Sequence, residues 1–493
     1  MQIYVQDLVA VLRRGGRRPV LRHGGTDTTA AGLLADIARC ARALENLGVG
    51  RGDLVALFAP NRPEALAVRY AAHLVGAAAV YLPAPSDPGR RARLVAQVDP
   101  RLVVVFPETA ALLPAGVPAP VAAVGPVPGV ALRLDALAAG LDPGPLPCRA
   151  RPGDLAVGIP SGGTTGVPKV SRRDFATYTA MVSEPSRADR RQLANGSLAH
   201  LTQALVDQTL LGGGTVVLQD GYDPVATLAA IESERITDLF LVEPQLFDLM
   251  DRPEVAQYDL GSLRALTHVG ALAPPVLRAR ARARLGPVVA HTYGASEVGI
   301  VSALAPAEHD RPSRFRCAGR VRPGVEVRFR RPDGTTDPRA GQVEVRSRAM
   351  AQGYRNRPAD EREHFVDGWY RTGDLGSLDE GMLRVLGRAA DAQALEAVPP
   401  VDLMETLCRL PSVRYAVVVP DPGRRVCVVA AEAWPGGAVD VDACREAVAA
   451  EHGGPVAASL QVLPVERVPL TEQGKPDRAA IRAAASAARV RVG

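Results

Sequence analysis

A glycine- and threonine-rich segment directly follows a strand-like stretch at residues 155–159 and ends in a lysine. Its residues are Ser161, Gly162, Gly163, Thr164, Thr165, Gly166, Val167, Pro168 and Lys169. Glycines let the backbone approach an anion closely, the hydroxyl groups add donors, and the lysine adds a point charge. The segment therefore predicts a binding loop for a polyphosphate. It is not a Walker A loop, because Lys169 does not directly follow the last glycine and is itself followed by Val170.

Lysine is almost absent from the rest of the chain. Of the 58 lysine and arginine residues, only Lys169 and Lys475 are lysines. A lysine places a compact ammonium group on a flexible stem, which suits a phosphate or a developing oxyanion in a way that a planar guanidinium does not. We therefore interpret both lysines as residues that handle phosphate.

The composition is that of a globular protein with several structural units. The chain has 493 residues, of which 47% are hydrophobic and 23% charged, which excludes wholesale disorder and collagen-like repeats. No uninterrupted apolar stretch reaches membrane-spanning length, and the N-terminal residues lack the features of a signal peptide. The six cysteines show neither metal-ligand spacing nor a disulfide framework. We therefore expect a cytoplasmic protein.

The net charge of +5 could indicate an anionic partner. Arginine, however, is spread evenly along the chain, and aromatic residues make up only 4%, too few for base-stacking surfaces. We expect neither a nucleic acid nor a membrane as a partner.

Helical and strand patterns alternate over much of the chain. Helices are expected at 31–47, 63–75, 224–234 and 275–285, and strands at 54–58, 77–82, 102–106, 214–218 and 238–242. This rhythm predicts mostly parallel sheets covered by helices.

The pattern changes twice towards the C-terminus. Short strands with glycine and proline turns follow residue 311, at 325–330 and 342–346. A new α/β pattern begins near residue 391, with helices at 401–409 and 441–452 and strands at 413–419 and 426–433. The sequence thus predicts an α/β protein with a large N-terminal domain of helix-covered β-sheets and a small α+β C-terminal domain. The first spans 1–390, with a β-rich subdomain from about 311, and the second spans 391–493.

Further motifs stand in a fixed order around the glycine-rich loop. They are Asn61-Arg62-Pro63-Glu64, His200 with Gly212-Gly213-Gly214-Thr215, Gly270-Ala271, Tyr293-Gly294-Ala295-Ser296-Glu297, Trp369-Tyr370-Arg371-Thr372-Gly373-Asp374-Leu375, Gly387-Arg388-Ala389-Ala390-Asp391 and Leu470-Thr471-Glu472-Gln473-Gly474-Lys475. The ordered set resembles the adenylate-forming (ANL) superfamily, which includes acyl- and aryl-CoA synthetases, nonribosomal adenylation domains and luciferase. The resemblance spans essentially the whole chain, and the loop is most similar to that of free-standing aryl-acid adenylating enzymes.

The resemblance implies a role for each motif. ATP would be bound by Ser161, Gly162, Gly163, Thr164, Thr165, Gly166, Gly270, Ala271, Tyr293, Gly294, Ser296, Asp374 and Arg388. Lys475, Glu297 and Lys169 would be the catalytic residues, and Glu297 with Thr165 would hold Mg²⁺. Within these assignments Asp374 would accept both ribose hydroxyls, and Lys475 would bridge the α-phosphate and the attacking carboxylate. Asp391 would be the hinge about which a mobile C-terminal domain turns.

These residue types suit the implied chemistry. An acyl adenylate forms when a carboxylate attacks the α-phosphate and pyrophosphate leaves, so two anions must be held together against their repulsion. Fixed cations and Mg²⁺ achieve this by positioning and charge stabilisation.

The resemblance places the acid pocket around His200, Gln203, Val269 and His291. Each histidine by itself is more often a structural residue than a ligand. Together with the polar Gln203 and Asp207, they favour a polar aryl acid over a long fatty chain.

The chain departs from the family directly after the hinge. Thioester-forming relatives usually continue with a lysine and a glycine, whereas this chain continues Asp391-Ala392-Gln393-Ala394-Leu395-Glu396-Ala397-Val398-Pro399-Pro400. Proline restricts this backbone further. The adenylating residues are thus intact, while coenzyme A as the acceptor is left open.

Three functions remain compatible with the sequence. The first is an ATP-dependent, AMP-forming ligase that adenylates a small aryl carboxylic acid and transfers it to coenzyme A or a carrier protein. The second is a related enzyme with another acceptor, such as one that activates nitrite with ATP and diazotises an aryl amine. The third is a non-catalytic ATP-binding pseudoenzyme, against which the retention of Lys475 argues.

Overall fold

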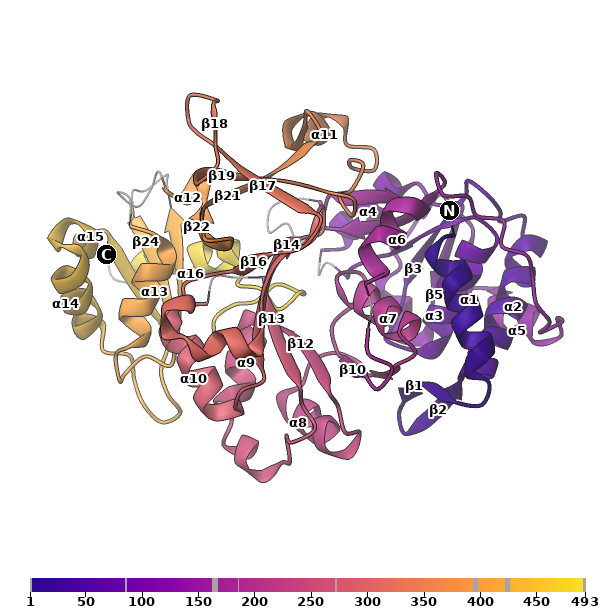
Figure 1. The fold of residues 1–493 in the computed structure, drawn as a ribbon, viewed down its shortest axis with the longest axis horizontal. Coiled ribbons are helices and arrows are strands. Elements are labelled where there is room, and N and C mark those ends of the chain that lie inside the picture. The colour runs from indigo at the N-terminus through magenta and orange to yellow at the C-terminus, as the bar shows by residue number, and fades with distance from the viewer. Residues whose placement is uncertain are drawn as a thin grey trace.

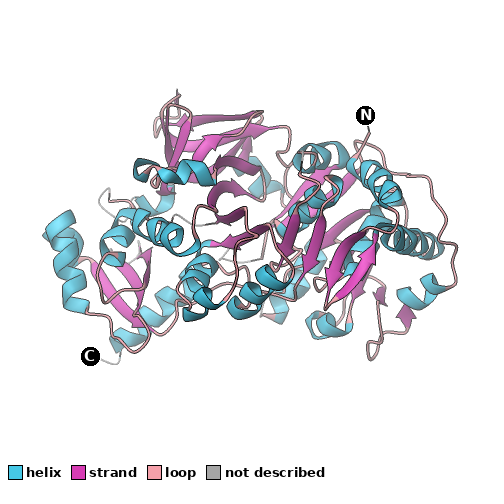
Figure 2. Cartoon of the chain, turned by 60° about the horizontal axis from the view of Figure 1, so that its bottom comes forward, coloured by secondary structure: helices cyan, strands magenta, loops and turns pink. Residues whose placement is uncertain are grey.

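The computed structural model describes residues 2–84, 87–161, 167–184, 186–270, 273–392, 398–421 and 426–490. Among these residues the strands form three sheets, and helices flank the strands in both halves of the molecule (Figure 2). The N-terminal elements occupy one half of the view in Figure 1, and the C-terminal elements lie at its opposite end. Within the described part of the chain, no helix combines the length and the apolar character needed to cross a bilayer.

The first sheet belongs to the N-terminal half. Its strands are β3 (Leu54–Phe58), β4 (Ala78–Tyr81), β5 (Leu102–Val105), β6 (Val121–Ala123), β7 (Leu132–Arg133), β8 (Leu155–Pro160) and β9 (Val170–Asp174). They lie in the order β7-β6-β5-β3-β4-β8-β9, and only the β8–β9 pair is antiparallel. This last pair brings together the two ends of the glycine-rich segment. The backbone N–H of Ser161 donates to the carbonyl of Lys169 at 2.6 Å.

The second sheet begins as a parallel sheet in the middle of the molecule. Its first strands are β1 (Pro19–His23), β2 (Thr26–Thr29), β10 (Arg191–Ala194), β11 (Thr215–Leu218), β12 (Asp238–Val242), β13 (Ala265–Val269) and β14 (Val289–Ala295). The pairs β1–β11, β10–β11, β10–β12, β12–β13 and β13–β14 are parallel. The carboxyl ends of β10, β12 and β13 therefore meet along one edge, where ligands bind in open α/β sheets.

The same sheet continues as an antiparallel one. Its remaining strands are β15 (Gly299–Leu304), β16 (Gly319–Val321), β17 (Val325–Arg330), β18 (Thr336–Asp337), β19 (Ala340–Ser347), β20 (Phe365–Val366), β21 (Trp369–Asp379) and β22 (Met382–Arg388). Their order is β18-β17-β19-β21-β22-β16-β15, after which β14 joins the parallel part. The β-rich segment predicted from about residue 311 is thus connected through β16 and β15 to β14, the last of the parallel strands.

The third sheet is formed by the C-terminal strands β23 (Tyr415–Asp421), β24 (Val426–Glu432) and β25 (Leu460–Val465). This sheet is mixed, because β23 and β24 pair antiparallel whereas β24 and β25 pair parallel. Its buried face shares a core with residues of the central sheet, because Leu403 and Tyr415 lie in the same hydrophobic cluster as Phe247. The C-terminal part is therefore docked onto the central part through apolar contact.

The helices are α1 (Tyr4–Gly15), α2 (Ala30–Asn46), α3 (Pro63–Leu74), α4 (Pro88–Val98), α5 (Leu134–Ala139), α6 (Phe175–Val182), α7 (Thr202–Leu211), α8 (Pro224–Ser233), α9 (Glu243–Met250), α10 (Pro275–Leu285), α11 (Pro358–His364), α12 (Ala389–Ala392), α13 (Pro400–Cys408), α14 (Val441–His452), α15 (Gly454–Ala458) and α16 (Arg478–Val490). Capping starts several of them, as when the side chain of Asp223 accepts from the backbone of Ala226 before α8. Helix α3 is buried along its length, in a core that joins the first sheet to α7 and β11.

The α/β fold class predicted from the sequence is confirmed. The expected elements at 54–58, 238–242, 275–285, 325–330 and 441–452 have the predicted bounds, and the others shift by only a few residues. The domain boundary at residues 390 and 391 and the mobility of the C-terminal domain stay predictions.

Candidate active site

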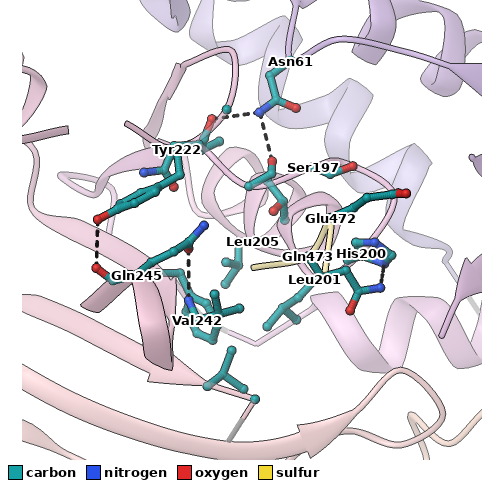
Figure 3. Close-up of a pocket in the computed structure, with 18 of the residues that line it drawn as sticks. Asn61, Ser197, His200, Leu201, Leu205, Tyr222, Val242, Gln245, Glu472 and Gln473 are labelled. Carbon is teal, nitrogen blue, oxygen red and sulfur yellow. Dashed lines mark hydrogen bonds between the residues drawn. The ribbon is translucent and has the colours of Figure 1, made fainter. Parts of the chain in front are cut away.

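A cavity of about 550 Å³ lies where the carboxyl ends of β10, β12 and β13 meet (Figure 3). The residues at this end of the cavity include Ser197, His200, Gln245, Val269, Gly270, Ser296, Glu472, Gln473 and Lys475. They come from segments far apart in the sequence, and the C-terminal segment closes over residues of the central sheet. The carboxyl ends of these strands and the predicted catalytic lysine therefore line the same cavity.

Lys475 reaches the cavity from a tight turn. The turn is closed by the backbone N–H of Thr471 donating to the carbonyl of Lys475 at 2.7 Å. Gly474 has a φ of +74°, and a Cβ there would lie 2.8 Å from Val242 Cγ2. Gly270 has a φ of +95°, and a Cβ there would lie 3.0 Å from Lys475 Cε. Both glycines therefore permit a close approach that a side chain would block.

The ammonium group of Lys475 stands among charged groups of both signs. Burial lowers its pKa, and the charge of Arg388 lowers it further, whereas Glu297 and Asp374 raise it. The lysine is therefore a cation held close to two carboxylates and partly removed from water, where it would attract a phosphate strongly.

Ser296 and Glu297 follow β14 in a turn that β9 holds from behind. The buried guanidinium of Arg173 donates to the carbonyl of Ser296 at 2.8 Å, and Ser171 Oγ donates to the same carbonyl at 3.2 Å. Burial lowers the pKa of Arg173 to about 10. The carboxylate of Glu297 is buried and accepts a hydrogen bond from Tyr354 Oη at 2.9 Å. Arg173 and Tyr354 thus fix this turn and were not found from the sequence.

Asp374 lies on β21 opposite Arg388 of β22. Its Oδ1 is 3.3 Å from Arg388 Nε, and its Oδ2 accepts from Tyr293 Oη at 2.6 Å. Arg388 also donates from Nη1 to the carbonyl of Thr372 at 2.9 Å. Burial raises the pKa of Asp374, while Arg388 and the Tyr293 hydroxyl oppose that change. The antiparallel register of β21 and β22 pairs Asp374 with Arg388, and Tyr293 reaches the same carboxylate from β14.

Lys169 does not line the cavity. Its Nζ lies 3.0 Å from Asp360 Oδ1 and 2.8 Å from His364 Nε2, both on α11. The ammonium group also stands 5.3 Å from the centre of the Tyr354 ring. Among the described residues, Asp360, Glu363 and His364 are grouped closely enough to hold a metal ion. In this structure the Lys169 ammonium lies beside that group, and Arg357 Nη1 lies 3.8 Å from Asp360 Oδ2.

His200 lines the cavity and contacts the segment that carries Lys475. Its Nδ1 lies 3.3 Å from both the carbonyl oxygen of Pro160 and Nε2 of Gln473 (Figure 3). Burial lowers its pKa to about 4, and the charge of Lys475 lowers it too. His200 is therefore a neutral imidazole near pH 7 that contacts the C-terminal turn.

Two predicted pocket residues lie elsewhere. Gln203 is buried in α7, whereas Leu201 and Leu205 of the same segment line the cavity, because residues two apart on a helix point in nearly opposite directions. His291 lies against His268, with 3.3 Å between their Nδ1 atoms. Strand alternation turns this pair away from the cavity face that Val269 occupies. The predictions for Gln203 and His291 as pocket residues therefore do not agree with the structure.

Several predicted residues lie outside the described residues. They are Gly162, Gly163, Thr164, Thr165, Gly166 and Ala271, together with residues 393–397 of the altered segment after the hinge. The predicted hinge residue Asp391 is described. Its Oδ1 is 2.6 Å from Nη2 of Arg478, which ties α12 to the start of α16.

The docked position of the C-terminal sheet buries a carboxyl group. Glu243, the first residue of α9, accepts hydrogen bonds from Tyr415 Oη at 3.3 Å to each of its oxygens. Burial raises the pKa of Glu243 to about 8 from 4.5. The side chain is therefore protonated in the folded protein at pH values where the unfolded chain is ionised.

This difference predicts a pH dependence of stability. Because the pKa of Glu243 is higher in the folded protein, its contribution is fully present below pH 4.5 and declines as the pH rises towards about 8. We expect Glu243→Gln to flatten the fall in melting temperature over that range, measured by circular dichroism. The exposed Glu446 offers the control, since Glu446→Gln should keep the wild-type pH profile. Equal slopes for wild type and Glu243→Gln would contradict this assignment.

Comparison with known proteins agrees with this geometry. The sequence matches the profile of the AMP-binding enzyme family over residues 9–355. The chain belongs to this family. It is an AMP-forming acid ligase, a member of the adenylate-forming superfamily, and AMP-binding enzymes use ATP.

Three relatives illustrate the family. The chain is 31% identical to the medium/long-chain-fatty-acid–CoA ligase FadD8 of Mycobacterium tuberculosis, covering 97% of this chain and 89% of that protein. It is 30% identical to a feruloyl-CoA synthase of an Amycolatopsis species, with 82% of each chain covered. It also resembles the solved structure of the amide bond synthetase McbA from Marinactinospora thermotolerans, with 32% identity, a TM-score of 0.86, and coverage of 97% of this chain and 99% of that chain.

Proposed function

We propose that the protein uses ATP and Mg²⁺ to adenylate a small aryl carboxylic acid and then transfers the acyl group to coenzyme A. The observation that carries this proposal is the cavity, which has Lys475 and Ser296 at one end and mostly apolar walls beyond them. The family match supports the first half of the reaction. The names of the fatty-acid and feruloyl relatives support the second.

The nucleotide would lie between β21 and the turn after β14. Asp374 would accept the ribose hydroxyls, a task for an ionised carboxylate, and Arg388 stands beside it. The buried Glu297 offers the kind of oxygen that Mg²⁺ prefers, since Tyr354 donates to only one of its two carboxylate oxygens. Glu297 would hold the ion together with Thr165. When bound, Mg²⁺ supplies charge neutralisation for the phosphates.

Lys475 would act where the two anions meet. In the first step an oxygen of the substrate carboxylate bonds to the α-phosphorus, and the bond from that phosphorus to pyrophosphate breaks. The Lys475 ammonium would stabilise the negative charge on both groups without giving up its proton. The close packing of the Lys475 side chain against Gly270 would help to keep water from this point.

An aryl acid suits the walls of the cavity. The apolar side chains along it include Met181, Leu201, Leu205, Phe240, Val242, Val269 and Ile300. Burying an aromatic ring against such walls is favourable, and the neutral His200 adds no charge that would oppose it.

One specific observation favours an amine, in place of coenzyme A, as the acceptor of the acyl group. The solved structure with 32% identity over nearly the full length of both chains is named as an amide bond synthetase. The altered segment after Asp391, which lacks the usual lysine and glycine, agrees with an acceptor other than coenzyme A. In that case an amine nitrogen would attack the acyl carbon, and AMP would leave. The relatives named above support neither nitrite activation nor a carrier protein nor a non-catalytic ATP-binding role.

A pyrophosphate-release screen tests the proposal. Benzoates, cinnamates, fatty acids and nitrite would each be offered with ATP and Mg²⁺, with coenzyme A or benzylamine, and the products identified by mass spectrometry. We expect release with aryl acids and an acyl-CoA product. An amide without thioester would assign the second acceptor, and absence of release with every acid would refute the proposal.

The assignment of Asp374 predicts a loss of nucleotide affinity. Asp374→Ala removes a charge-assisted acceptor for two hydroxyls, so we expect the dissociation constant of ATP to rise by about tenfold or more. Isothermal titration calorimetry measures this directly. Asp379→Ala, an exposed aspartate on the same strand, should leave the constant unchanged. An unaltered constant for Asp374→Ala would show that the ribose is held elsewhere.

A further inference from the structure

The cavity extends along β10 away from Lys475 and ends near a buried glutamine. Gln192 is the second residue of β10 and is 1% exposed, yet it lines the cavity. Ser197 and His200 follow the carboxyl end of this strand. Since each strand residue advances about 3.3 Å, Gln192 lies roughly 7 Å below Ala194. It therefore stands at the end of the cavity remote from the site of adenylation.

Most of the neighbouring wall is apolar. Strand alternation places Gln192 and Ala194 on one face of β10, and the parallel register sets Gln192 opposite Asp238, so Phe240 shares that face. Leu205 of α7 and Ile300 of β15 add apolar side chains to the lining of the same cavity. Among the cavity-lining side chains on this face of β10 and β12, Gln192 is the polar one, beside Ala194 and Phe240.

Arg190 fixes the orientation of this amide. Its Nε lies 3.2 Å from Gln192 Oε1, and its Nη2 contacts the same oxygen. A guanidinium can only donate, so the amide oxygen must face Arg190 and the amide nitrogen must face the other way. Nε2 donates one proton to the carbonyl of Leu193 at 2.9 Å. The contacts of the described residues thus use one of the two Nε2 protons.

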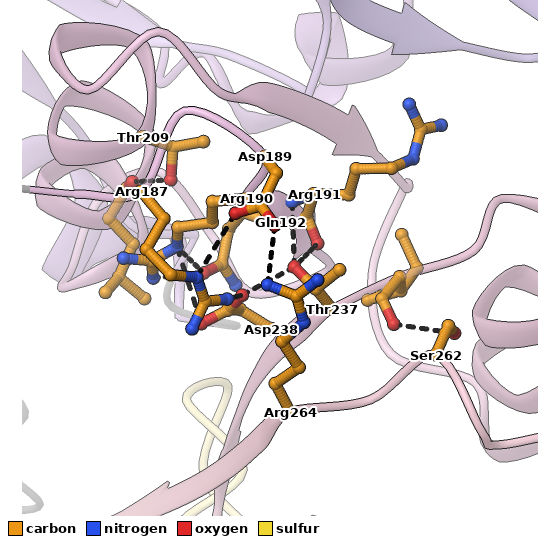
Figure 4. A network of polar contacts seen from close by, with 12 residues as sticks. Arg187, Asp189, Arg190, Arg191, Gln192, Thr209, Thr237, Asp238, Ser262 and Arg264 are labelled. Carbon is orange, nitrogen blue, oxygen red and sulfur yellow. Dashed lines mark hydrogen bonds and ion pairs between the residues drawn. The ribbon is translucent and has the colours of Figure 1, made fainter.

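Arg190 is itself held in a charged network (Figure 4). Asp238 lies 3.8 Å from Arg190 Nε and 2.8 Å from Arg187 Nη2. Asp189 lies between two guanidinium groups. Its carboxylate is 3.3 Å from Arg187 Nε and 2.6 Å from Arg264 Nη1. The network holds three guanidinium groups against two carboxylates, so its excess charge is positive. Donation from Arg190 polarises the Gln192 amide and makes its remaining N–H a stronger donor.

We propose that Gln192 is a specificity-determining residue that donates a hydrogen bond from Nε2 to an ether, phenol or carbonyl oxygen on the acid, at the end remote from its carboxylate. This rests on the proposed function, because it assumes that the cavity holds the acid. The class of substrate is an aryl acid with an oxygen opposite its carboxyl group. An acid with an apolar tail would leave this buried donor without a partner, which costs free energy. A site of this kind therefore discriminates against such acids.

Two nearly isosteric acids test the proposal. The probes are 4-methoxybenzoate and 4-ethylbenzoate, with the corresponding cinnamates as a longer pair. The measured quantity is kcat/KM for pyrophosphate release. We expect the wild type to favour the methoxy acid by about tenfold. Gln192→Leu should bring this ratio to one or below while retaining activity on the ethyl acid.

A second variant keeps the shape of the side chain. Gln192→Glu retains the acceptor for Arg190 but has no Nε2 donor, so it should also lose the preference for the ether. Gln203→Leu is the matched control, since this buried glutamine lies outside the cavity, and its ratio should equal that of the wild type.

The outcomes separate the two proposals. Release with these acids and an unchanged ratio in both Gln192 variants would overturn the role of Gln192 and leave the ligase function intact. A wild-type ratio near one in both series would overturn it as well. Absence of release with every acid of the screen would refute the proposed function, and the role of Gln192 with it.

Discussion

Replacing Lys475 by alanine is expected to reduce the rate of pyrophosphate release by about a hundred- to a thousandfold, the usual effect of removing one donor to a developing charge. The ammonium group is held near Asp374 and Glu297 and over Gly270, where an attacking carboxylate and a phosphate would meet. ATP affinity should change little, because Asp374 and Arg388 remain. Single-turnover pyrophosphate release and calorimetric titration with ATP measure the two quantities separately.

Two further variants sharpen this prediction. Lys475→Arg keeps the charge but replaces a compact ammonium with a wider planar group in a turn packed against Gly270, so we expect it to be nearly as slow. Arg467→Ala removes an exposed cation near the same turn and should retain the wild-type rate. Wild-type turnover in Lys475→Ala would remove the mechanism proposed for this site.

The largest expected effect on stability comes from Asp207. Its carboxylate accepts from both terminal nitrogens of Arg69, at 3.0 and 2.8 Å, and both side chains are fully buried. Tyr70 and Tyr178 donate to the same carboxylate at 2.5 and 2.6 Å. Asp207→Ala would leave a buried guanidinium without its counter-charge, so we expect the free energy of unfolding to fall by about 3–5 kcal/mol. Urea denaturation followed by circular dichroism measures it.

The control is an ion pair at the surface, between strands β1 and β2. Asp27 lies 2.9 Å from Arg22 at the surface, and Asp27→Ala should cost less than about 1 kcal/mol. The double variant Arg69→Met with Asp207→Leu removes both charges together and should recover much of the stability that Asp207→Ala loses. Equal losses for Asp207→Ala and Asp27→Ala would show that the buried pair is not structurally important.

The residues implied by sequence motifs could be predicted, whereas the residues that hold them in place could not. Lys475, Glu297 and Asp374 were predicted from the family resemblance of their motifs, and their residue types suit a phosphate site, whose chemistry restricts the side chains that can serve it. Tyr354 and Arg173, which hold the Glu297 turn, carry no such signal. They are ordinary residue types, and their partners lie 57 and 123 positions away in the chain.

The amino-acid sequence by itself determined the local elements and the chemistry. The helix at 275–285 and the strand at 238–242 follow from apolar periodicity, which depends only on neighbouring residues. Only the tertiary structure decided which polar side chains face the cavity. Gln192 and Gln203 are the same residue type and both are buried. The polar Asp207, in the stretch that the sequence associates with the pocket, pairs instead with Arg69, 138 positions away. The direction of a side chain is set by how a sheet and a helix pack together, and that packing joins residues whose separation along the chain leaves no local pattern.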